Sequence, residues 1–581
     1  MIERTFQAAA AVLAAAFLAS GIVFLCQGHI TVTVFDMWHL YGFALNHPLR
    51  AILTKYGSHS FFFPTIIWLT DITFFGNNQE LLFLLGLTLL IVTAIVLLIS
   101  VWRDNTISRT AKVVASVVVV TINFSMSRAS ITSIGPFNCI CSPALLGAVV
   151  AFTCLAAAGA ARRLSPWAII LMIIAGFVSS FSFGSGFAVW PTLLFLGWSA
   201  RLSWRALATI LGAGVIAVVV YLILPGAAPE IAVQDAISTS TALRRFCSLL
   251  GTPFLYAVKA WSFRPLSIAA AQSSNIPVAF GAAGIALVLA AALPRFMRRD
   301  LGDSKLQMIA LALTIFNFIA IGFIVAGRTA HMHASASEVV APRYMFWSSL
   351  FWAGLFLVLV QWADAKRWAR WPVFSTLSLL PILVWPQHYQ TAAWAKYVRL
   401  LMDSAATSLI NGVCDNEKVV ELYRKPDIIY ALAQQYRQKR LDMFAAGIQD
   451  WIGRSAGDVS GGRYRSVRLQ GNVTVQSLIR CEKGPAAGRV TGWAIERERH
   501  IPRRLVLLDP NGTVCGLARP AEIRMDVNGR NKLGKFTASG FLGYIRNYNP
   551  ETRYTACAAD DNGFSRETLP VAPLQPAPSD K

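Results

Sequence analysis

The chain has 581 residues, of which 55% are hydrophobic and only 14% are charged. Its mean hydropathy of +0.52 is too high for a soluble globular protein, so we exclude that class. The formal net charge of +22 raises the question of nucleic-acid binding. No helix-turn-helix, zinc-finger or RNA-binding signature accompanies this charge, and an anionic lipid headgroup or phosphate is the more natural partner. We therefore expect a polytopic membrane protein and no nucleic-acid partner.

Long apolar runs recur through the first two thirds of the chain. Most have roughly 17 to 23 residues, enough for a helix to cross about 30 Å of hydrocarbon. They lie at 7–27, 79–101, 112–127, 143–161, 167–183, 187–200, 206–224, 277–293, 306–326, 344–361 and 371–387. The sequence thus predicts about 11 membrane-spanning helices within residues 1–390. The first run is longer than a signal-peptide core of roughly 7 to 15 residues, so we interpret it as a retained span.

Lysine and arginine residues gather in alternate loops between these runs, which predicts that those loops are cytoplasmic. The residues concerned are Arg103, Arg109, Lys112, Arg162, Arg163, Arg201, Arg205, Arg295, Arg298, Arg299, Lys305, Lys366, Arg367 and Arg370. The N-terminus falls on the same side. The loop around Asp36, the stretch 225–276 and everything after about 388 are expected to face outward. In a bacterium this arrangement predicts an inner (cytoplasmic) membrane protein with a periplasmic C-terminal domain.

The hydropathy changes near Pro386, where a soluble region begins. Residues 391–460 have helical apolar periodicity, and residues 461–570 have short strand patterns separated by turns. We expect a periplasmic helical segment followed by a β-sandwich-like domain, with a disordered Pro-rich tail at 571–581. The predicted fold class is a polytopic α-helical membrane domain followed by a soluble α+β region.

Cysteines and short motifs limit the chemistry further. Cys414, Cys481, Cys515 and Cys557 lie in the outer region and allow three disulfide connectivities, among which the spacing does not choose. The chain has no dinucleotide fingerprint, P-loop, zinc-protease motif or serine-hydrolase elbow. We expect no cofactor and no metal ligands; a divalent cation is not indicated by the sequence.

The loop after the first apolar run carries the main catalytic candidate. Asp36 lies about 9 residues beyond that run, next to Trp38 and Tyr41, which suit the interfacial aromatic belt. A carboxylate at this boundary is suited to general-base catalysis on an acceptor hydroxyl. The alternative is a solvated or helix-capping aspartate.

Three further residues follow in the same part of the chain. His59 is a candidate contact for a phosphate or a sugar hydroxyl. Asp71 and Glu80 lie near the beginning of the second long apolar run and are candidate substrate contacts, ranked below Asp36. Asp71 has the alternative role of capping a re-entrant segment.

Two arginines mark the outer ends of later runs. Arg328 follows one run and Arg343 precedes the next. Because arginine stays charged and binds phosphate oxygens in pairs, both are candidates for binding a lipid-linked phosphate. The alternative is snorkelling of each side chain to ordinary headgroups.

These features together resemble bacterial membrane glycosyltransferases of the GT-C class. The resemblance rests on the Asp36 loop, His-Ser-Phe-Phe-Phe-Pro at 59–64, Ser-Phe-Gly-Ser-Gly-Phe-Ala-Val-Trp-Pro at 182–191, and Gly-Arg followed by Ala-Pro-Arg-Tyr within 327–344. It covers roughly residues 1–390. It implies transfer of a sugar from a polyprenyl-phosphate donor to a glycan or glycolipid acceptor, with Asp36 as base. Arg343 and Arg328 would then hold the donor phosphate. The loop departs from the commoner family pattern of two adjacent acidic residues.

The C-terminal domain also resembles accessory modules of such enzymes, in Gly-Arg-Val-Thr-Gly-Trp-Ala at 488–494 and Ser-Gly-Phe-Leu-Gly-Tyr at 539–544. Trp493 is a candidate for stacking on a sugar ring, although aromatic residues at strand spacing belong more often to a core. Two other functions stay open. A lipid-linked glycan polymerase or ligase would use the basic stretch 225–276, and a transporter would need ionisable residues within its spans.

Overall fold

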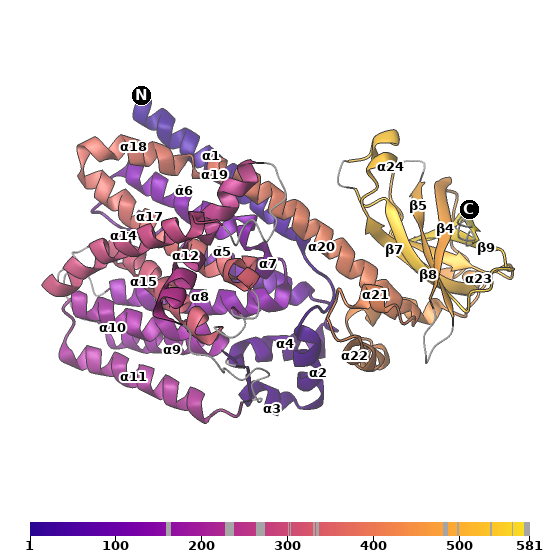
Figure 1. Cartoon of the computed structure of the whole chain (residues 1–581), viewed down its shortest axis with the longest axis horizontal. Coiled ribbons are helices and arrows are strands. Elements are labelled where there is room, and N and C mark those ends of the chain that lie inside the picture. The colour runs from indigo at the N-terminus through magenta and orange to yellow at the C-terminus, as the bar shows by residue number, and fades with distance from the viewer. Residues whose placement is uncertain are drawn as a thin grey trace. The chain divides into compact units, whose positions relative to one another are not determined.

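The computed structural model of the chain describes residues 1–57, 59–157, 164–226, 238–262, 274–299, 301, 304–328, 332, 336–479, 486–496, 499–534, 537–560 and 562–573 (Figure 1). It contains two compact units. The first, called the helical unit, comprises Met1–Gln27, His47–Ile67 and Leu82–Ala392. The second, called the mixed unit, comprises Gly28–Asn46, Trp68–Leu81 and Ala393–Lys581. The first loop with Asp36 therefore groups with the C-terminal region, whereas a division at residue 390 had placed it with the spans.

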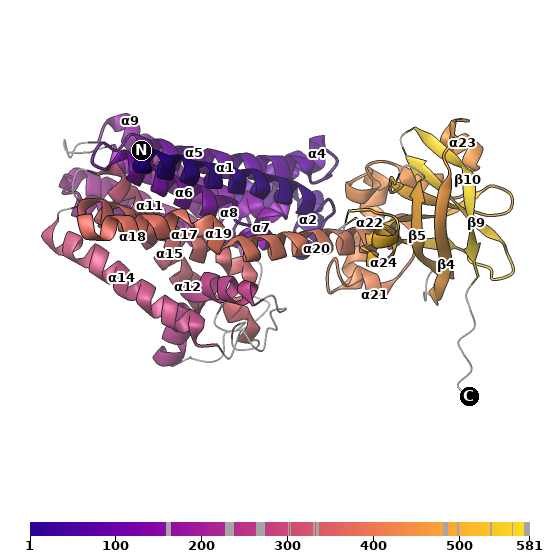
Figure 2. The same cartoon turned by 90° about the horizontal axis from the view of Figure 1, so that it is seen from above.

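The helical unit is built almost entirely of helices. Its elements are α1 (Ile2–Gly28), α3 (Pro48–Leu53), β1 (Lys55–Tyr56), β2 (His59–Ser60), α4 (Phe62–Phe74), α5 (Glu80–Trp102), α6 (Arg109–Phe124), η1 (Met126–Arg128), α7 (Ala129–Thr132), α8 (Gly135–Ala156), α9 (Pro166–Ser182), η3 (Gly184–Ala188), α10 (Val189–Ser199), α11 (Trp204–Ile223), α12 (Thr239–Trp261), α14 (Ile276–Arg298), α15 (Lys305–Gly327), η4 (Ala336–Val340), η5 (Pro342–Tyr344), α17 (Met345–Ala365), α18 (Arg367–Ser378), α19 (Leu380–Leu383) and the start of α20 (Trp385–Asn411). Helices α4, α5 and α20 continue across the unit boundaries. Within the bundle, α17 packs against both α6 and α15, and α15 packs against α8 (Figure 2).

Among the described residues, eight helical segments are long and apolar enough to span a membrane. They are Ile2–Gly28, Glu80–Trp102, Arg109–Thr132, Gly135–Ala156, Trp204–Ile223, Ile276–Arg298, Lys305–Gly327 and Glu338–Ala365. The chain therefore has the character of a membrane-embedded protein.

The expected count of about 11 spans is not confirmed. The run 167–183 corresponds to α9, which has 17 residues, and the run 187–200 contains α10, which has 11. The run 371–387 is divided among α18, α19 and the start of α20, with Pro381 and Pro386 at the starts of the last two helices. Proline suits a first helical turn but not a helix interior, and hydropathy alone does not register this division. The stretch 225–276, expected as an outer loop, contains the 23-residue helix α12.

Serine residues begin five helices of this unit. The hydroxyls of Ser108, Ser165, Ser203, Ser238 and Ser304 each accept a hydrogen bond from a main-chain N–H three residues later. Each thus satisfies one of the amide groups left free at a helix N-terminus. The serine caps therefore determine where these helices begin.

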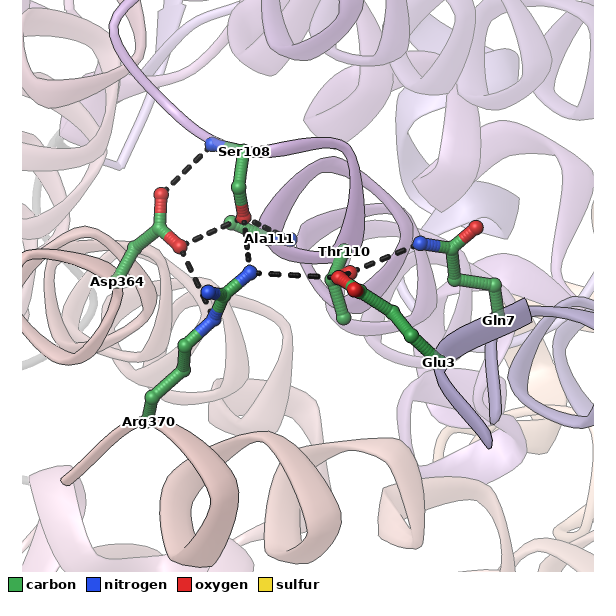
Figure 3. Close-up of polar contacts among 7 residues, drawn as sticks. All are labelled: Glu3, Gln7, Ser108, Thr110, Ala111, Asp364 and Arg370. Carbon is green, nitrogen blue, oxygen red and sulfur yellow. Dashed lines mark hydrogen bonds and ion pairs between the residues drawn. The ribbon is translucent and has the colours of Figure 1, made fainter. Parts of the chain in front are cut away.

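A polar network joins four helices at one end of the bundle (Figure 3). Arg370 of α18 lies 3.4 Å from Glu3 of α1 and 3.5 Å from Asp364 of α17. Asp364 accepts hydrogen bonds from the main-chain N–H and the hydroxyl of Ser108, at 2.7 and 2.6 Å. Thr110 of α6 donates to Glu3. Helix α1 is thus held to α6, α17 and α18 as a part of the helical unit.

The mixed unit ends in a closed β-barrel. The elements of the mixed unit are α2 (Met37–Asn46), the rest of α20, α21 (Asn416–Val419), α22 (Pro426–Lys439), η6 (Asp442–Phe444), η7 (Ile448–Trp451), α23 (Ala456–Ser460), β3 (Tyr464–Arg465), β4 (Leu469–Ile479), β5 (Ala487–Glu496), β6 (Arg504–Leu508), β7 (Val514–Glu522), α24 (Met525–Arg530), β8 (Gly540–Arg546), β9 (Tyr554–Asp560) and β10 (Gly563–Ala572). The strand order is β3-β10-β4-β5-β8-β7-β6-β9, and β10 also pairs with β9.

The pairing of β10 with both β4 and β9 closes the sheet, so the expected β-sandwich is corrected to a barrel. Val571 and Ala572 belong to β10, so the expected disordered tail does not begin at 571. Residues 574–581 lie outside the described part of the chain. The helical segment expected at 391–460 is present as α20 to α23.

The structure describes three cysteines of this region, Cys414, Cys515 and Cys557, and no disulfide links them to one another. Cys481 lies outside the described residues.

Candidate functional site

Arg128 of η1 is the most unusual side chain of the helical unit. Its relative exposure is 0%, and its Nη2 donates to the main-chain oxygen of Asn123. Its Nε and Nη1 atoms are buried without a hydrogen-bond partner, and among the described residues no carboxylate pairs with it. A buried cation without a partner costs several kcal/mol, so such a group calls for a bound anion or water.

Aromatic rings connect Arg128 to His59. The guanidinium of Arg128 lies over the ring of Phe346, 4.7 Å from its centre, and Phe346 contacts Trp347 at 5.0 Å. Trp347 stacks with Phe183 at 5.9 Å, and Phe183 stacks with His59 at 4.5 Å. The motifs around residues 59, 183 and 344 thus lie together in the helical unit.

Arg343 and Arg328 belong to the same unit. Arg343 forms an ion pair with Glu338 and lies 5.2 Å from the ring centre of Tyr344, in η5, which contacts η1 and α7. Arg328 follows the last residue of α15. Burial, together with the nearby charge of Arg328, lowers the pKa of His59 to about 3. His59 is therefore a neutral imidazole at physiological pH, able to donate or accept a hydrogen bond but not to add positive charge.

The helical unit thus contains three arginines of interest: Arg128, Arg328 and Arg343. Arg343 has a carboxylate partner, whereas Arg128 has two guanidinium nitrogens available. A guanidinium presents N–H groups in a planar fork that matches two oxygens of a phosphate. The chemistry that this part of the helical unit supports is anion binding.

Asp36 lies in the mixed unit, immediately before α2. Its side chain is exposed, and its main-chain oxygen accepts hydrogen bonds from the N–H groups of His39 and Leu40, at 3.1 and 3.0 Å. The carboxylate is therefore accessible from outside the protein. An exposed carboxylate is free to reach a hydroxyl of a bound molecule.

Asp71 has the opposite environment, since its relative exposure is 0%. Neither carboxylate oxygen accepts a well-formed hydrogen bond. Burial raises the pKa of Asp71 to about 6, although the main-chain N–H of Gln79 opposes this. Burial also raises the pKa of Asp442, to about 7, and the charge of Asp71 contributes to this. The two aspartates are thus electrostatically linked, and protons are bound there near neutral pH.

The main chain around these aspartates is strained. Phe35, Asn77, Gln79 and Asp442 have φ angles of 54°, 55°, 66° and 56°. Left-handed conformations are uncommon for residues other than glycine and cost of order 1–3 kcal/mol. Hydrogen bonds keep the segments together: Asp442 accepts from the N–H of Thr33 at 2.8 Å. This loop junction of the mixed unit is therefore held in one conformation by its contacts.

Two other sequence-predicted residues also lie in the mixed unit. Glu80 is exposed and is the first residue of α5. Trp493 is half-buried in β5, opposite Asn472 of β4 and Gly540 of β8. Phe541 is 3% exposed and belongs to the barrel core, whereas Tyr544 is 0% exposed and packs in a separate cluster with Val413.

The structure thus brings His59 close to Arg328, and Arg343 close to the segment of Arg128. Sequence reasoning missed Arg128 and Asp442. A lone arginine directly after the apolar run 112–127 was the available signal for Arg128. No pattern marked Asp442, whose relation to Asp71 depends on tertiary structure. In the described part of the chain, no group of three or more His, Cys, Asp or Glu residues is arranged to hold a metal.

Comparison with known proteins assigns the chain to no family. The chain matches no protein-family profile, and no curated protein is significantly similar to it. The functional proposal therefore rests on the geometry of the candidate site.

Proposed function

We propose that this protein is an integral membrane glycosyltransferase. It moves a sugar from a polyprenyl-phosphate donor to a hydroxyl of a cell-envelope glycan or glycolipid, on the outer face of the bacterial inner membrane. The observation that carries the proposal is the fully buried guanidinium of Arg128, which has two nitrogens without a hydrogen bond and no carboxylate partner among the described residues.

A lipid-linked phosphate is the anion that suits this position. Arg128 follows α6, which belongs to the apolar segment Arg109–Thr132, so an anion beside it would be near the end of a membrane span. Phe346, Trp347 and Phe183 give that position apolar surroundings. A free inorganic anion would gain nothing from those rings, whereas the first units of a polyprenyl chain would be stabilised by burial against them.

The catalytic roles follow from exposure and charge. Asp36 is exposed, and among the described residues it has no ion-pair partner, so it acts as general base. It takes the proton of the acceptor hydroxyl while the hydroxyl oxygen bonds to the anomeric carbon. The bond between that carbon and the phosphate oxygen breaks, and the negative charge on the departing lipid phosphate is stabilised by Arg128, with Arg343 and Arg328 in support.

The remaining residues have supporting roles. Neutral His59 hydrogen-bonds to a sugar hydroxyl of the donor. Glu80 is available to an acceptor hydroxyl because it is exposed. Asp71 is buried, so we assign it to holding the first loop in place rather than to substrate contact.

The alternative function is a lipid-linked glycan polymerase or ligase. Such an enzyme would rely on the basic residues Arg244, Arg245 and Lys259 of α12, of which Arg244 is exposed. Arg264 lies outside the described residues. Both functions need a lipid-linked phosphate, but only the transferase depends on Asp36.

Lipid binding tests the observation that carries the proposal. Purified protein in a neutral detergent is titrated with undecaprenyl phosphate and, separately, with undecaprenol, which lacks the phosphate. Wild-type protein should bind the phosphate form at least tenfold more tightly, and Arg128→Gln should remove that preference, since hydrogen bonds to charged groups contribute about 1.5–3 kcal/mol.

Arg299→Gln is the matched control. Arg299 also lies over an aromatic ring, that of Trp198 at 4.0 Å, but it is only half-buried. This control should bind as the wild type does. Equal binding of the two lipids by the wild type, or an unchanged preference in Arg128→Gln, would overturn the proposal.

A further inference from the structure

A cleft of about 500 Å³ opens on the barrel of the mixed unit, where β4 begins and where β5 and α24 end. Four basic residues line it: Arg468, Arg499, Arg530 and Lys532. All four are exposed. In the described part of the chain none of them forms an ion pair with a carboxylate. The cleft therefore presents four available cationic groups.

The two acidic residues of the cleft already have partners. Glu496 forms an ion pair with Arg465, at 2.9 Å. Glu567 accepts a hydrogen bond from the main-chain N–H of Leu469, at 3.0 Å. The four basic residues outnumber these two carboxylates, so the net charge of the cleft lining is positive.

Two of the basic residues are held in an uncommon conformation. Arg499 and Lys532 have φ angles of 62° and 53°. Residues other than glycine rarely adopt this left-handed region, and such strain is found most often where a side chain has a functional position to keep. Both residues thus line the cleft from positions where the main chain is in the left-handed region.

The other residues that line the cleft distinguish between classes of ligand. Gln470 and Asn531 supply amide groups that can hydrogen-bond to hydroxyls. No aromatic residue is among the lining residues, so stacking on a neutral sugar is not supported. The apolar lining residues Leu469 and Ile495 are 8% and 4% exposed, which leaves no apolar surface for insertion into a membrane.

We propose that this cleft binds an anionic glycan, one that carries carboxylate or phosphate groups. The inference rests on the proposed function only for the choice of a glycan over another polyanion, and binding is measurable without catalysis. The concave shape favours a discrete oligosaccharide over the flat surface of an anionic membrane. Guanidinium groups bind carboxylates and phosphates in the same paired manner, so both kinds of anionic glycan are expected to bind.

Binding to the full-length protein in neutral detergent tests the proposal. The probes are an oligogalacturonide hexamer, a phosphorylated oligomannose, neutral maltohexaose and phosphatidylglycerol vesicles. The cleft variant is Arg468→Gln with Arg530→Gln. The control variant is Arg463→Gln with Arg553→Gln, which removes two exposed arginines of the same unit from outside the cleft. Both variants lower the net charge equally.

We expect the wild type to bind one or both anionic oligosaccharides and not maltohexaose. The cleft variant should lose about tenfold in affinity and the control variant less than twofold. Equal losses in both variants would show nonspecific attraction to a basic surface and overturn the proposal. The absence of binding to both anionic oligosaccharides would also overturn it. So would cleft-dependent binding of the vesicles alone, which would indicate a membrane-docking surface. None of these results depends on transferase activity, so failure here is distinguishable from failure of the proposed function.

Discussion

The guanidinium of Arg128 lies 4.7 Å from the centre of the Phe346 ring, in a position with no exposed surface. A cation–π contact contributes about 2 kcal/mol when desolvated, which does not offset the cost of burying an unpaired charge. The buried charge of Arg128 thus lowers the stability of the protein when no ligand is bound.

Replacing Arg128 with methionine should therefore leave the ligand-free protein as stable as the wild type or make it more stable, because an unpaired buried charge is removed at similar volume. Thermal unfolding of the protein in detergent measures this. Added undecaprenyl phosphate should raise the unfolding temperature of the wild type only. A purely structural role would instead give a variant that unfolds at a lower temperature.

The buried aspartates of the mixed unit predict a pH dependence. The pKa of Asp71 is raised to about 6 and that of Asp442 to about 7, so both bind protons more tightly in the folded than in the unfolded state. Their contribution favours folding at low pH and is lost as pH rises from about 4 to about 8. Each pKa unit corresponds to about 1.4 kcal/mol.

Asp442→Asn removes one of these titrating groups. Relative to the wild type, the variant should gain several degrees in unfolding temperature at pH 8 and less at pH 5, because the folded wild-type protein must bury an ionised carboxylate at pH 8 but holds this residue protonated at pH 5. Unfolding curves at both pH values give the comparison. An equal shift at both pH values would contradict the assignment.

A buried ion pair supports the barrel. Arg489 of β5 donates to Asp415 at 2.7 and 2.8 Å, and the hydroxyl of Tyr544 donates to the same carboxylate at 2.7 Å. Arg489→Met leaves Asp415 buried without its cation and should destabilise the mixed unit by about 3–5 kcal/mol. Chemical denaturation monitored through the fluorescence of the protein measures this. As a control, Arg524→Gln breaks only the exposed pair with Asp526 and should change little.

Close packing of α12 against α14 gives a test of the helical unit. A Cβ atom at Gly281 of α14 would lie 1.9 Å from the main-chain oxygen of Cys247 of α12. Gly281→Ala should therefore separate the two helices and cost about 1–3 kcal/mol. Gly212→Ala in α11 meets nothing within 4 Å and should stabilise its helix by up to about 1 kcal/mol. Thermal unfolding of the two variants should move in opposite directions.

The sequence predicted the elements that depend on local pattern. Long apolar runs identified the eight span-length helices, and short strand patterns indicated β-structure within residues 461–570, the region that holds β3 to β9 and most of β10. It did not predict the closure of the sheet, because the pairing of β10 with β4 joins residues about 100 positions apart and leaves no local signal. It also missed α12, whose mixed polar and apolar sequence is lost in a hydropathy average.

The candidate site shows the same limit. Residue type and position marked Asp36, Arg328 and Arg343, because each lies at the end of an apolar run or shortly after one. The burial of Asp71 and the unpartnered state of Arg128 are results of tertiary packing. The sequence therefore indicates which residues can take part in the chemistry, and the fold determines which of them are desolvated.

Sugar transfer itself tests the central claim most directly. Membranes that contain the wild type, Asp36→Asn or the control Asp427→Asn receive a panel of radiolabelled polyprenyl-phosphate sugars, and label in envelope glycans is counted. Asp427 is an exposed carboxylate in the first turn of α22, so its variant removes an equivalent charge. We predict transfer from at least one donor by the wild type and the control, and at least a hundredfold loss in Asp36→Asn. Transfer that is unaffected by Asp36→Asn, or absent with every donor, would contradict the glycosyltransferase account.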